Sequence, residues 1–254
     1  MTAELHDKVC LVTGASRGIG AAIATLLAER GGKIAVHYGS NEEAAQAVCN
    51  SLNGDDHRIF GCDLADAAVA PNLVERVVKA FGRIDVLVNN AGIYIAHPVL
   101  KVSGDEWLQA WRQIFEVNLV SPAALCQSAA KAMATKGGGR IVNVGSRGAF
   151  RGEPLGPAYG ASKAALHSMS QSLAVALAPD NIQVFAVAPG FVQTDMAKPL
   201  LESEAGDGIR GQSPLNRVGT PEEIAEAVAF LASTAPEFMI GGVIDINGAS
   251  YLRM

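Results

Sequence analysis

Thr13-Gly14-Ala15-Ser16-Arg17-Gly18-Ile19-Gly20 follows a short apolar run that begins at Val9, and it leads into an alanine-rich stretch with helical periodicity. This order predicts a strand, a glycine turn and a helix that begins near Gly18. Free N–H groups and the dipole at a helix N-terminus favour an anion, and glycine lets a pyrophosphate approach the backbone. The stretch therefore predicts a dinucleotide phosphate cradle, with a purely structural turn as the alternative.

Short apolar runs alternate with helical segments along the whole chain. The expected strands are 9–13, 33–37, 58–62, 86–89, 140–144, 183–188 and 243–246, and the helical segments are 20–30, 42–52, 70–81, 107–135, 162–178 and 221–232. Strands without polar alternation are typical of a parallel sheet that is covered on both faces. We expect an α/β fold: one doubly wound (Rossmann) parallel seven-stranded sheet with helices on both faces and ligands at the carboxyl edge.

Composition narrows the class of protein. The chain of 254 residues is 49% hydrophobic and has no linker or composition break, so we expect a single domain over 1–254. A formal net charge of −5 without a basic stripe argues against nucleic acid as a partner. The four cysteines lack metal-ligand spacing and are expected to be buried, reduced thiols. Without a signal peptide or an apolar run long enough for a membrane, the sequence predicts a soluble cytoplasmic protein.

The end of the second expected strand bears on the choice of nucleotide. After Val36 the chain reads His37-Tyr38-Gly39-Ser40-Asn41, and no acid appears before Glu42. An acid at this place would favour the ribose 2′-hydroxyl of NAD, whereas a cation favours a 2′-phosphate. Arg17, with Ser40, Asn41 and His37, can surround such a phosphate, so we predict NADP(H); the alternative for Arg17 is an exposed loop arginine.

Three residues form a candidate acid–base group. Tyr159 and Lys163 are four residues apart, so they share one face of a helix, and an ammonium nearby is expected to lower the pKa of the phenol toward neutral pH. Ser146 ends an expected strand and can polarise a carbonyl oxygen. The alternative is a surface Tyr/Lys pair.

These residues resemble the short-chain dehydrogenase/reductase family over nearly the whole chain. The matching motifs are the glycine turn, Asn89-Asn90-Ala91-Gly92, Asn118, Ser146, Tyr159-x-x-x-Lys163, and Pro189-Gly190 followed by Thr194. The resemblance implies that Tyr159 protonates a carbonyl while hydride leaves the nicotinamide, Lys163 lowers the tyrosine pKa and holds the ribose, Ser146 positions the carbonyl, and Asn118 holds a relay water. It implies no metal.

The resemblance also implies a set of cofactor contacts. Asp63 resembles the adenine contact, with a helix N-cap as its alternative role, and the segment ending at Thr194 resembles the nicotinamide support. The expected cofactor residues are Gly14, Ser16, Arg17, Gly18, Ile19, Gly20, Tyr38, Ser40, Asn41, Asp63, Leu64, Asn90, Ala91, Gly92, Tyr159, Lys163, Pro189, Gly190, Val192 and Thr194.

The sequence says less about the substrate than about the cofactor. Residues 190–196 and 241–248 resemble the 3-oxoacyl-[acyl-carrier-protein] reductases, so a 3-oxoacyl thioester or similar ketone is expected. An acyl carrier protein is a candidate partner, although Gly137 to Gly139 and Asp180 stand where those reductases tend to carry cations. The alternatives are a sugar, polyol or other secondary-alcohol dehydrogenase, and a catalytically silent nucleotide-binding regulator.

Further expectations concern the surroundings of the site. Arg147 and Arg151 can meet a carboxylate or phosphate of a small substrate; alternatively they are solvated or pair with Glu153. Residues 198–211 are expected to form a substrate lid, and His97 to be a solvated loop histidine. Small apolar residues on several faces of 107–135 and 162–178 predict a homo-oligomer, with a homotetramer implied by the resemblance.

Overall fold

The computed structural model describes residues 4–253, and it contains one sheet of seven parallel strands. The strands are β1 (Val9–Val12), β2 (Lys33–Tyr38), β3 (Arg58–Gly61), β4 (Val86–Asn89), β5 (Gly139–Val144), β6 (Ile182–Pro189) and β7 (Val243–Ile246). Their order is β3-β2-β1-β4-β5-β6-β7, so the chain winds outward from β1 in one direction and then from β4 in the other. The predicted doubly wound sheet is confirmed, and the point of reversal lies between β1 and β4.

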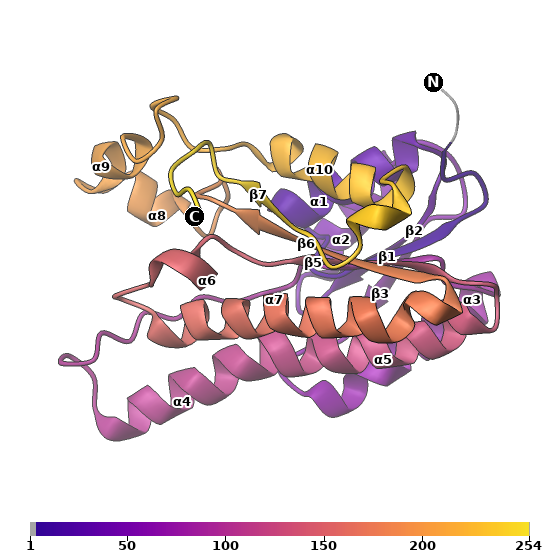
Figure 1. Ribbon diagram of the computed structural model, residues 1–254, viewed down its shortest axis with the longest axis horizontal. Coiled ribbons are helices and arrows are strands. Elements are labelled where there is room, and N and C mark those ends of the chain that lie inside the picture. The colour runs from indigo at the N-terminus through magenta and orange to yellow at the C-terminus, as the bar shows by residue number, and fades with distance from the viewer. Residues whose placement is uncertain (1–3, 254) are drawn as a thin grey trace.

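Helices cover both faces of this sheet, as Figure 1 shows. One face carries α1 (Gly18–Glu29), α2 (Glu42–Ser51) and α10 (Pro221–Ser233); the other carries α3 (Ala70–Phe81), α4 (Gly104–Phe115), α5 (Ser121–Ala134) and α7 (Pro157–Leu177). Short helices α6 (Gly148–Arg151), α8 (Lys198–Leu201) and α9 (Gly206–Arg210) lie at one end of the sheet.

Two hydrophobic clusters hold these layers together. Ile23 and Leu27 of α1 pack with Val228 of α10 against one face of the strands. Leu73 of α3 and Met133 of α5 are part of the cluster on the other face. Side chains alternate between the two faces along each strand, so a strand buried on both faces is apolar throughout.

The segment 107–135 differs from the single helix that we predicted. The helix begins earlier, because Ser103 and Glu106 form a capping box before α4. A π turn, Glu116–Val120, then separates α4 from α5, and the N–H of Ser121 donates to the carbonyl of Glu116. In a regular helix the N–H of residue 122 would donate to the carbonyl of Asn118. Pro122 has no N–H, and the proline ring crowds that carbonyl. The interruption thus falls on an expected site residue.

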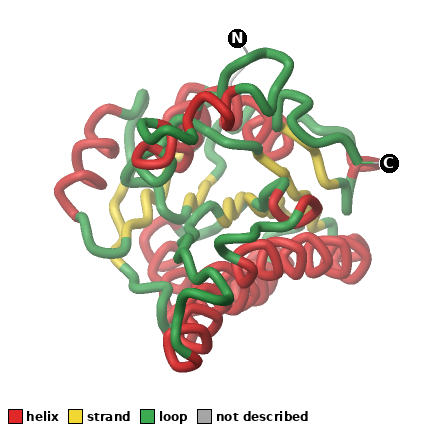
Figure 2. The backbone as a smooth tube through the Cα atoms, turned by 90° about the vertical axis from the view of Figure 1, so that its left-hand side faces the viewer, coloured by secondary structure: helices red, strands yellow, loops and turns green. Residues whose placement is uncertain are grey.

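The loops that follow the strands gather at the carboxyl edge of the sheet. This edge lies on the left of Figure 1 and faces the viewer in Figure 2, where loops dominate the surface. The lid segment 198–211, predicted as a mobile loop, contains α8 and α9 at this same end. Within residues 4–253, no helix is both long and apolar enough to span a membrane.

Candidate active site

The glycine turn has the backbone shape that an anion cradle requires. Gly14 and Gly18 have φ of +62° and +55°, values that side chains with a Cβ rarely adopt. A Cβ on Gly20 would lie 2.2 Å from the carbonyl oxygen of Gly14, so the helix and the turn could not pack as closely with any other residue. These three glycines therefore place no side chain of their own in the way of an anion at the start of α1.

Neighbouring side chains hold this turn in place. Nδ1 of His37 accepts a hydrogen bond from the N–H of Gly14 at 3.0 Å, and Nε2 pairs with the carbonyl of Cys62 at 2.9 Å. Asn90 Nδ2 donates to the carbonyls of Thr13 and Gly14, while Thr13 Oγ1 accepts from the N–H of Asn90. The prediction that His37 surrounds a 2′-phosphate is wrong, because both of its ring nitrogens are buried and occupied.

The residues expected near a 2′-phosphate are exposed beside the turn. Arg17 reaches Asp195 at 3.8 Å in an ion pair whose two side chains are 75% and 71% exposed, so the arginine can be drawn away at little cost. Ser40 is exposed, and Asn41 caps α2 by accepting from the N–H of Ala44. Tyr38 packs against Gly61, where a Cβ would lie 2.9 Å from its hydroxyl.

The residues expected at the adenine side follow β3. Asp63 is exposed, and its Oδ1 accepts from the N–H of Ala65 at 2.9 Å. The alternative role of Asp63 as a helix N-cap is wrong: Asp66 is the residue that caps the next turn, by accepting from Ala68. Leu64 is buried, and its carbonyl accepts from the hydroxyl of Ser121. The main chain here is thus anchored to the start of α5.

Tyr159, Lys163 and Ser146 lie together at the end of β5 and the start of α7. Lys163 is buried; its Nζ is 5.8 Å from the centroid of the Tyr159 ring and donates to the carbonyl of Val144 at 2.9 Å. Burial lowers the pKa of Lys163 to about 8. Ser146 Oγ accepts from the N–H of Gly148 at 3.0 Å.

The expectation of a lowered tyrosine pKa is wrong in this structure. Burial raises the pKa of Tyr159 to about 12, Ser146 offsets this only in part, and the nearby Glu153 and Tyr94 add to the rise. The ammonium of Lys163 is directed to a backbone carbonyl and not to the phenol. Tyr159 is therefore a neutral proton donor at neutral pH.

The side chain of Asn118 is fully committed to the protein. Its Oδ1 accepts from the N–H of Ile93 at 2.9 Å, and its Nδ2 donates to the carbonyl of Ile93 and to Ser162 Oγ. Gly92 lies between Asn118 and Lys163: a Cβ there would be 3.3 Å from Asn118 Oδ1 and 3.4 Å from Lys163 Nζ. Ala91 is anchored through its N–H, which donates to Thr13 Oγ1.

The segment after β6 returns to the glycine turn. A Cβ on Gly18 would touch Thr194 Cγ2 at 3.4 Å, so Thr194 lies directly at the turn. Val192 is buried and forms an isolated bridge with Gly219. Gly190, after Pro189, faces Asn247, whose Cα would be 3.0 Å from a Cβ at that position.

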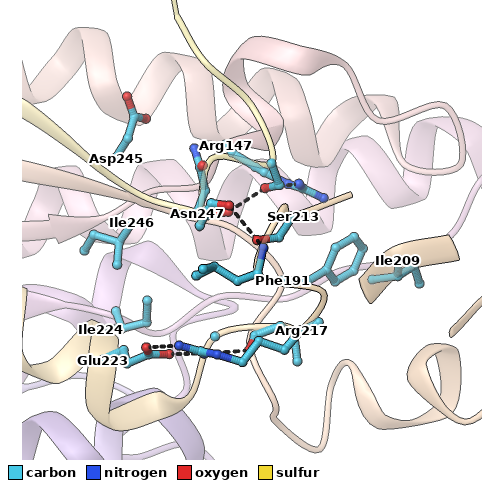
Figure 3. Close-up of a pocket in the computed structure, with 15 residues that line it drawn as sticks. Arg147, Phe191, Ile209, Ser213, Arg217, Glu223, Ile224, Asp245, Ile246 and Asn247 are labelled. Carbon is cyan, nitrogen blue, oxygen red and sulfur yellow. Dashed lines mark hydrogen bonds and ion pairs between the residues drawn. The ribbon is translucent and has the colours of Figure 1, made fainter. Parts of the chain in front are cut away.

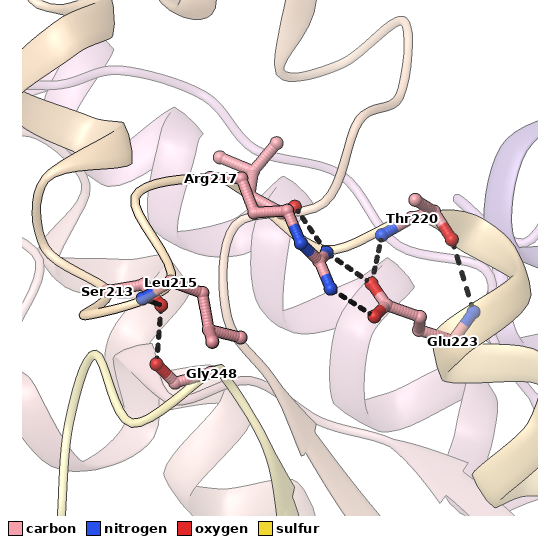
Figure 4. Close-up of polar contacts among 7 residues, drawn as sticks. Ser213, Leu215, Arg217, Thr220, Glu223 and Gly248 are labelled. Carbon is pink, nitrogen blue, oxygen red and sulfur yellow. Dashed lines mark hydrogen bonds and ion pairs between the residues drawn. The ribbon is translucent and has the colours of Figure 1, made fainter.

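A cavity of about 280 Å³ lies behind this segment, between α9, residues 213–219 and the end of β7. Figure 3 shows Arg147 toward one end of the cavity and the Arg217–Glu223 pair at the other. Figure 4 shows what anchors the chain after the segment 198–211: Ser213 Oγ donates to the carbonyl of Gly248, and Arg217 pairs with Glu223, which also completes a capping box with Thr220.

The close contact between α7 and the residue before Ser146 was not predicted from the sequence. His167, one helical turn after Lys163, packs on Gly145, where a Cβ would lie 1.8 Å from His167 Nε2. Burial, with the charge of Lys163, lowers the pKa of His167 to about 4. The glycine at position 145, directly before Ser146, was the one sign in the sequence that another element packs closely there.

His97 also differs from the expected solvated histidine. It is 1% exposed, its Nδ1 pairs with the carbonyl of Ile95 at 2.7 Å, and its Nε2 accepts from the N–H of Ala158 at 3.2 Å. His97 thus satisfies a free N–H in the first turn of α7, the helix that carries Tyr159.

Comparison with known proteins places this arrangement in a family. A family described as enoyl-(acyl carrier protein) reductase matches residues 14–249. The 3-oxoacyl-[acyl-carrier-protein] reductase FabG of Escherichia coli is 39% identical over 98% of this chain and 99% of its own length. The D-threitol dehydrogenase of Mycolicibacterium smegmatis is 38% identical over 98% and 95%.

A solved structure agrees with these sequence relatives. The short chain dehydrogenase of Burkholderia cenocepacia, crystallised in complex with NADP, superposes with a TM-score of 0.86 at 35% identity, and the match covers 97% of this chain and 99% of that one. The glycine turn follows β1 and Ser146 follows β5, both at the carboxyl edge of the sheet, and Lys163 lies beside Tyr159. The chain belongs to the short-chain dehydrogenase/reductase family of oxidoreductases.

Proposed function

We propose that this protein is an NADP(H)-dependent reductase that converts a carbonyl group, in a 3-oxoacyl thioester or a similar ketone, to an alcohol. One observation carries the proposal: the phenol of Tyr159 lies beside Ser146 and the buried Lys163, at the sheet edge that also holds the glycine turn. A proton donor, a hydrogen-bonding hydroxyl and a phosphate cradle are the parts that carbonyl reduction requires.

The described residues fit a dinucleotide. Gly14, Gly18 and Gly20 leave room for a pyrophosphate at the start of α1, and Thr194 lies at the same turn. Arg17 and Ser40 are exposed where a 2′-phosphate would lie, and Tyr38, Asp63 and the main chain at Leu64 border that end. NADPH, when bound, supplies the hydride. The remaining chemistry falls to the side chains of this protein.

Each catalytic residue has a separate task. Tyr159 donates its proton to the carbonyl oxygen, and Ser146 holds that oxygen by a hydrogen bond. Lys163, anchored on the carbonyl of Val144, brings a positive charge beneath the phenol and offers donors to a ribose. The side-chain amide of Asn118 is hydrogen-bonded to the main chain of Ile93. Its main-chain carbonyl lacks the usual helical donor because residue 122 is a proline. Asn118 therefore contributes to a proton relay by holding a water on that carbonyl.

Two other functions remain candidates. A sugar or polyol dehydrogenase uses the same residues, and the D-threitol dehydrogenase relative favours it. Tyr159 acts as the acid in reduction and as the base in oxidation, so both directions use the same residues. The FabG relative of Escherichia coli, a reductase by name, favours reduction. A catalytically silent regulator would not need Tyr159, Lys163 and Ser146 together.

The substrate is a small ketone or a 3-oxoacyl thioester. An acyl carrier protein receives limited support from the surface near β5: Arg140 is half-buried and donates to the carbonyls of Leu231 and Ala235, so it is not available to an acidic partner. Lys131 and Lys136 are exposed there.

We further propose that residues 1–254 form a single domain, that the protein acts in the cytoplasm, and that it is a homotetramer.

The experiment that tests this function is NADPH oxidation with an acetoacetyl thioester, simple ketones and sugars, preceded by paired fluorescence titrations of NADPH and NADH. Thioester or ketone turnover with tighter NADPH binding supports the proposal. Turnover of sugars or polyols alone would replace it with the second candidate, and no turnover with any compound despite nucleotide binding would leave the regulator.

A further inference from the structure

Arg147, directly after Ser146, is a buried cation without a carboxylate partner among the described residues. Its side chain is 3% exposed, and its guanidinium donates to Gln212 Oε1 at 2.5 Å and to Ser250 Oγ. It also lies over the ring of Phe191, 5.1 Å from the centroid. A buried charge with only neutral partners is unfavourable, so an anion at this position would be strongly favoured.

A second arginine converges on the same acceptor. Arg151, exposed at the end of α6, donates from Nη1 to Gln212 Oε1 at 2.7 Å. Glu153, the carboxylate nearest in sequence, is half-buried and interacts electrostatically with both arginines, but among the described residues no ion pair joins it to either of them. A single neutral amide oxygen thus stands between two guanidinium groups. Oxygens of a carboxylate or phosphate match two such donors better, because they add charge to the same geometry.

The remaining charges around the adjoining cavity are already neutralised. Arg217 makes two hydrogen bonds to Glu223, of 2.8 and 2.6 Å, at the far end of the cavity in Figure 3. Asp245 pairs with Arg253 at 2.7 Å. The cavity of about 280 Å³ borders Arg147 and Phe191 but not Arg151, so room for an anion between the two arginines requires withdrawal of the Gln212 side chain.

We propose that Arg147 and Arg151 bind a carboxylate or phosphate group, which takes the place of the Gln212 side chain. Gln212 lies two residues after the end of α9, the second helix of the segment 198–211, so its withdrawal would accompany movement of that segment. The anion is either an acidic group carried by the substrate at a distance from its carbonyl, or a free anion. The first source rests on the proposed function, and the second does not.

Binding is tested without turnover, by thermal unfolding with and without inorganic phosphate at constant ionic strength. Saturating NADP⁺ is present so that the glycine turn does not bind the phosphate. Phosphate at ten times its dissociation constant is expected to raise the wild-type midpoint by about 3 °C.

Arg151→Gln should remove most of this shift. Gln212→Glu should remove it as well, because it places a carboxylate of the protein between the arginines, and it should raise the midpoint without phosphate. Arg58→Gln, on the exposed edge strand, is the control and should keep the shift.

The source of the anion is tested by turnover, with an oxo acid and its methyl ester as matched substrates. If the substrate supplies the anion, the wild-type kcat/KM ratio of acid to ester is expected to fall about 10- to 100-fold in Arg151→Gln, and to be retained in Arg58→Gln.

The outcomes separate this inference from the proposed function. Loss of both the phosphate shift and the acid preference in Arg151→Gln assigns the site to the substrate, and loss of the phosphate shift alone assigns it to a free anion. A protein that reduces no carbonyl but shows the predicted phosphate shifts would refute the function and support the anion site. A phosphate shift that is absent in wild type, or that both variants retain at its wild-type size, together with an unchanged acid-to-ester ratio, would overturn the inference.

Discussion

His37 of β2 accepts a hydrogen bond from the N–H of Gly14, so a histidine from the second strand fixes the first glycine of the cofactor turn. The ring is 2% exposed, and its other nitrogen pairs with the carbonyl of Cys62. Only a neutral imidazole has a free Nδ1 lone pair for Gly14. The conformation of the turn is thus linked to the protonation state of a buried histidine.

Acid should destabilise the protein through His37. Burial lowers its pKa to about 4 from 6.5, so its contribution to the unfolding free energy is fully present above pH 6.5 and is lost as the pH falls through 4. The full loss is about 3 kcal/mol. Denaturant unfolding between pH 4 and 6.5 should show a flatter pH dependence for His37→Leu than for wild type. His6→Gln, at an exposed position, is the control; equal slopes for wild type and His37→Leu would contradict this prediction.

The contact between Gly145 and His167 should be essential to the site. Gly145→Ala places a Cβ 1.8 Å from His167 Nε2, so the buried His167 ring, the Ser146 loop or α7 must move. We expect a loss of about 1 to 3 kcal/mol in unfolding free energy and at least a tenfold loss of kcat. Gly145→Ala combined with His167→Ala should recover part of both, measured by chemical denaturation and NADPH oxidation. A single Gly145→Ala variant with wild-type kcat would show that the contact does not position Ser146.

Arg17 should select for the 2′-phosphate. Arg17→Ser is expected to weaken NADPH binding about tenfold and to leave NADH binding nearly unchanged, because only NADPH carries the phosphate. The loss should shrink at high salt. Paired fluorescence titrations measure both constants, with Asp195→Asn as the control that removes only the present partner of Arg17. Equal losses for NADPH and NADH would assign Arg17 to the pyrophosphate or to the fold.

The exposed apolar side chains on α4, the π turn and α7 should mark the surface between subunits. Leu108, Val120 and Val175 are 51%, 43% and 80% exposed. If these helices pair between copies, Val175→Asp should shift the light-scattering mass from a tetramer toward a dimer or monomer. Val99→Asp, on the loop before α4 and 64% exposed, is the matched control. A wild-type monomer at micromolar concentration would refute the assembly.

Sequence patterns predicted most of the fold because its inner strands are buried on both faces. The runs 9–12 and 86–88 are apolar throughout, and the structure places both in inner strands. The interruption at Asn118 was missed because alanine-rich periodicity continues through it, although Pro122 was a local signal. Spacing also placed Tyr159, Lys163 and Ser146 in one site.

The pKa values of the site residues could not be predicted from their spacing in the sequence. Tyr159 and Lys163 share a helix face as predicted, but burial dominates both pKa values, and the Lys163 ammonium is held by the carbonyl of Val144, 19 residues upstream. His37 and His97 were misassigned for the same reason: their partners, Gly14 and Ala158, come from other parts of the chain. Burial and long-range hydrogen bonds appear only once the chain is folded.

The most direct test of the account is NADPH oxidation with a ketone substrate by wild type and Tyr159→Phe, measured beside NADPH binding by fluorescence. The phenyl ring fills the same space but has no proton to donate. We predict that Tyr159→Phe binds NADPH within about twofold of wild type and loses kcat by about 1,000-fold or more. A Tyr159→Phe variant that binds NADPH and still reduces the ketone at a rate near that of wild type would contradict the central role of Tyr159.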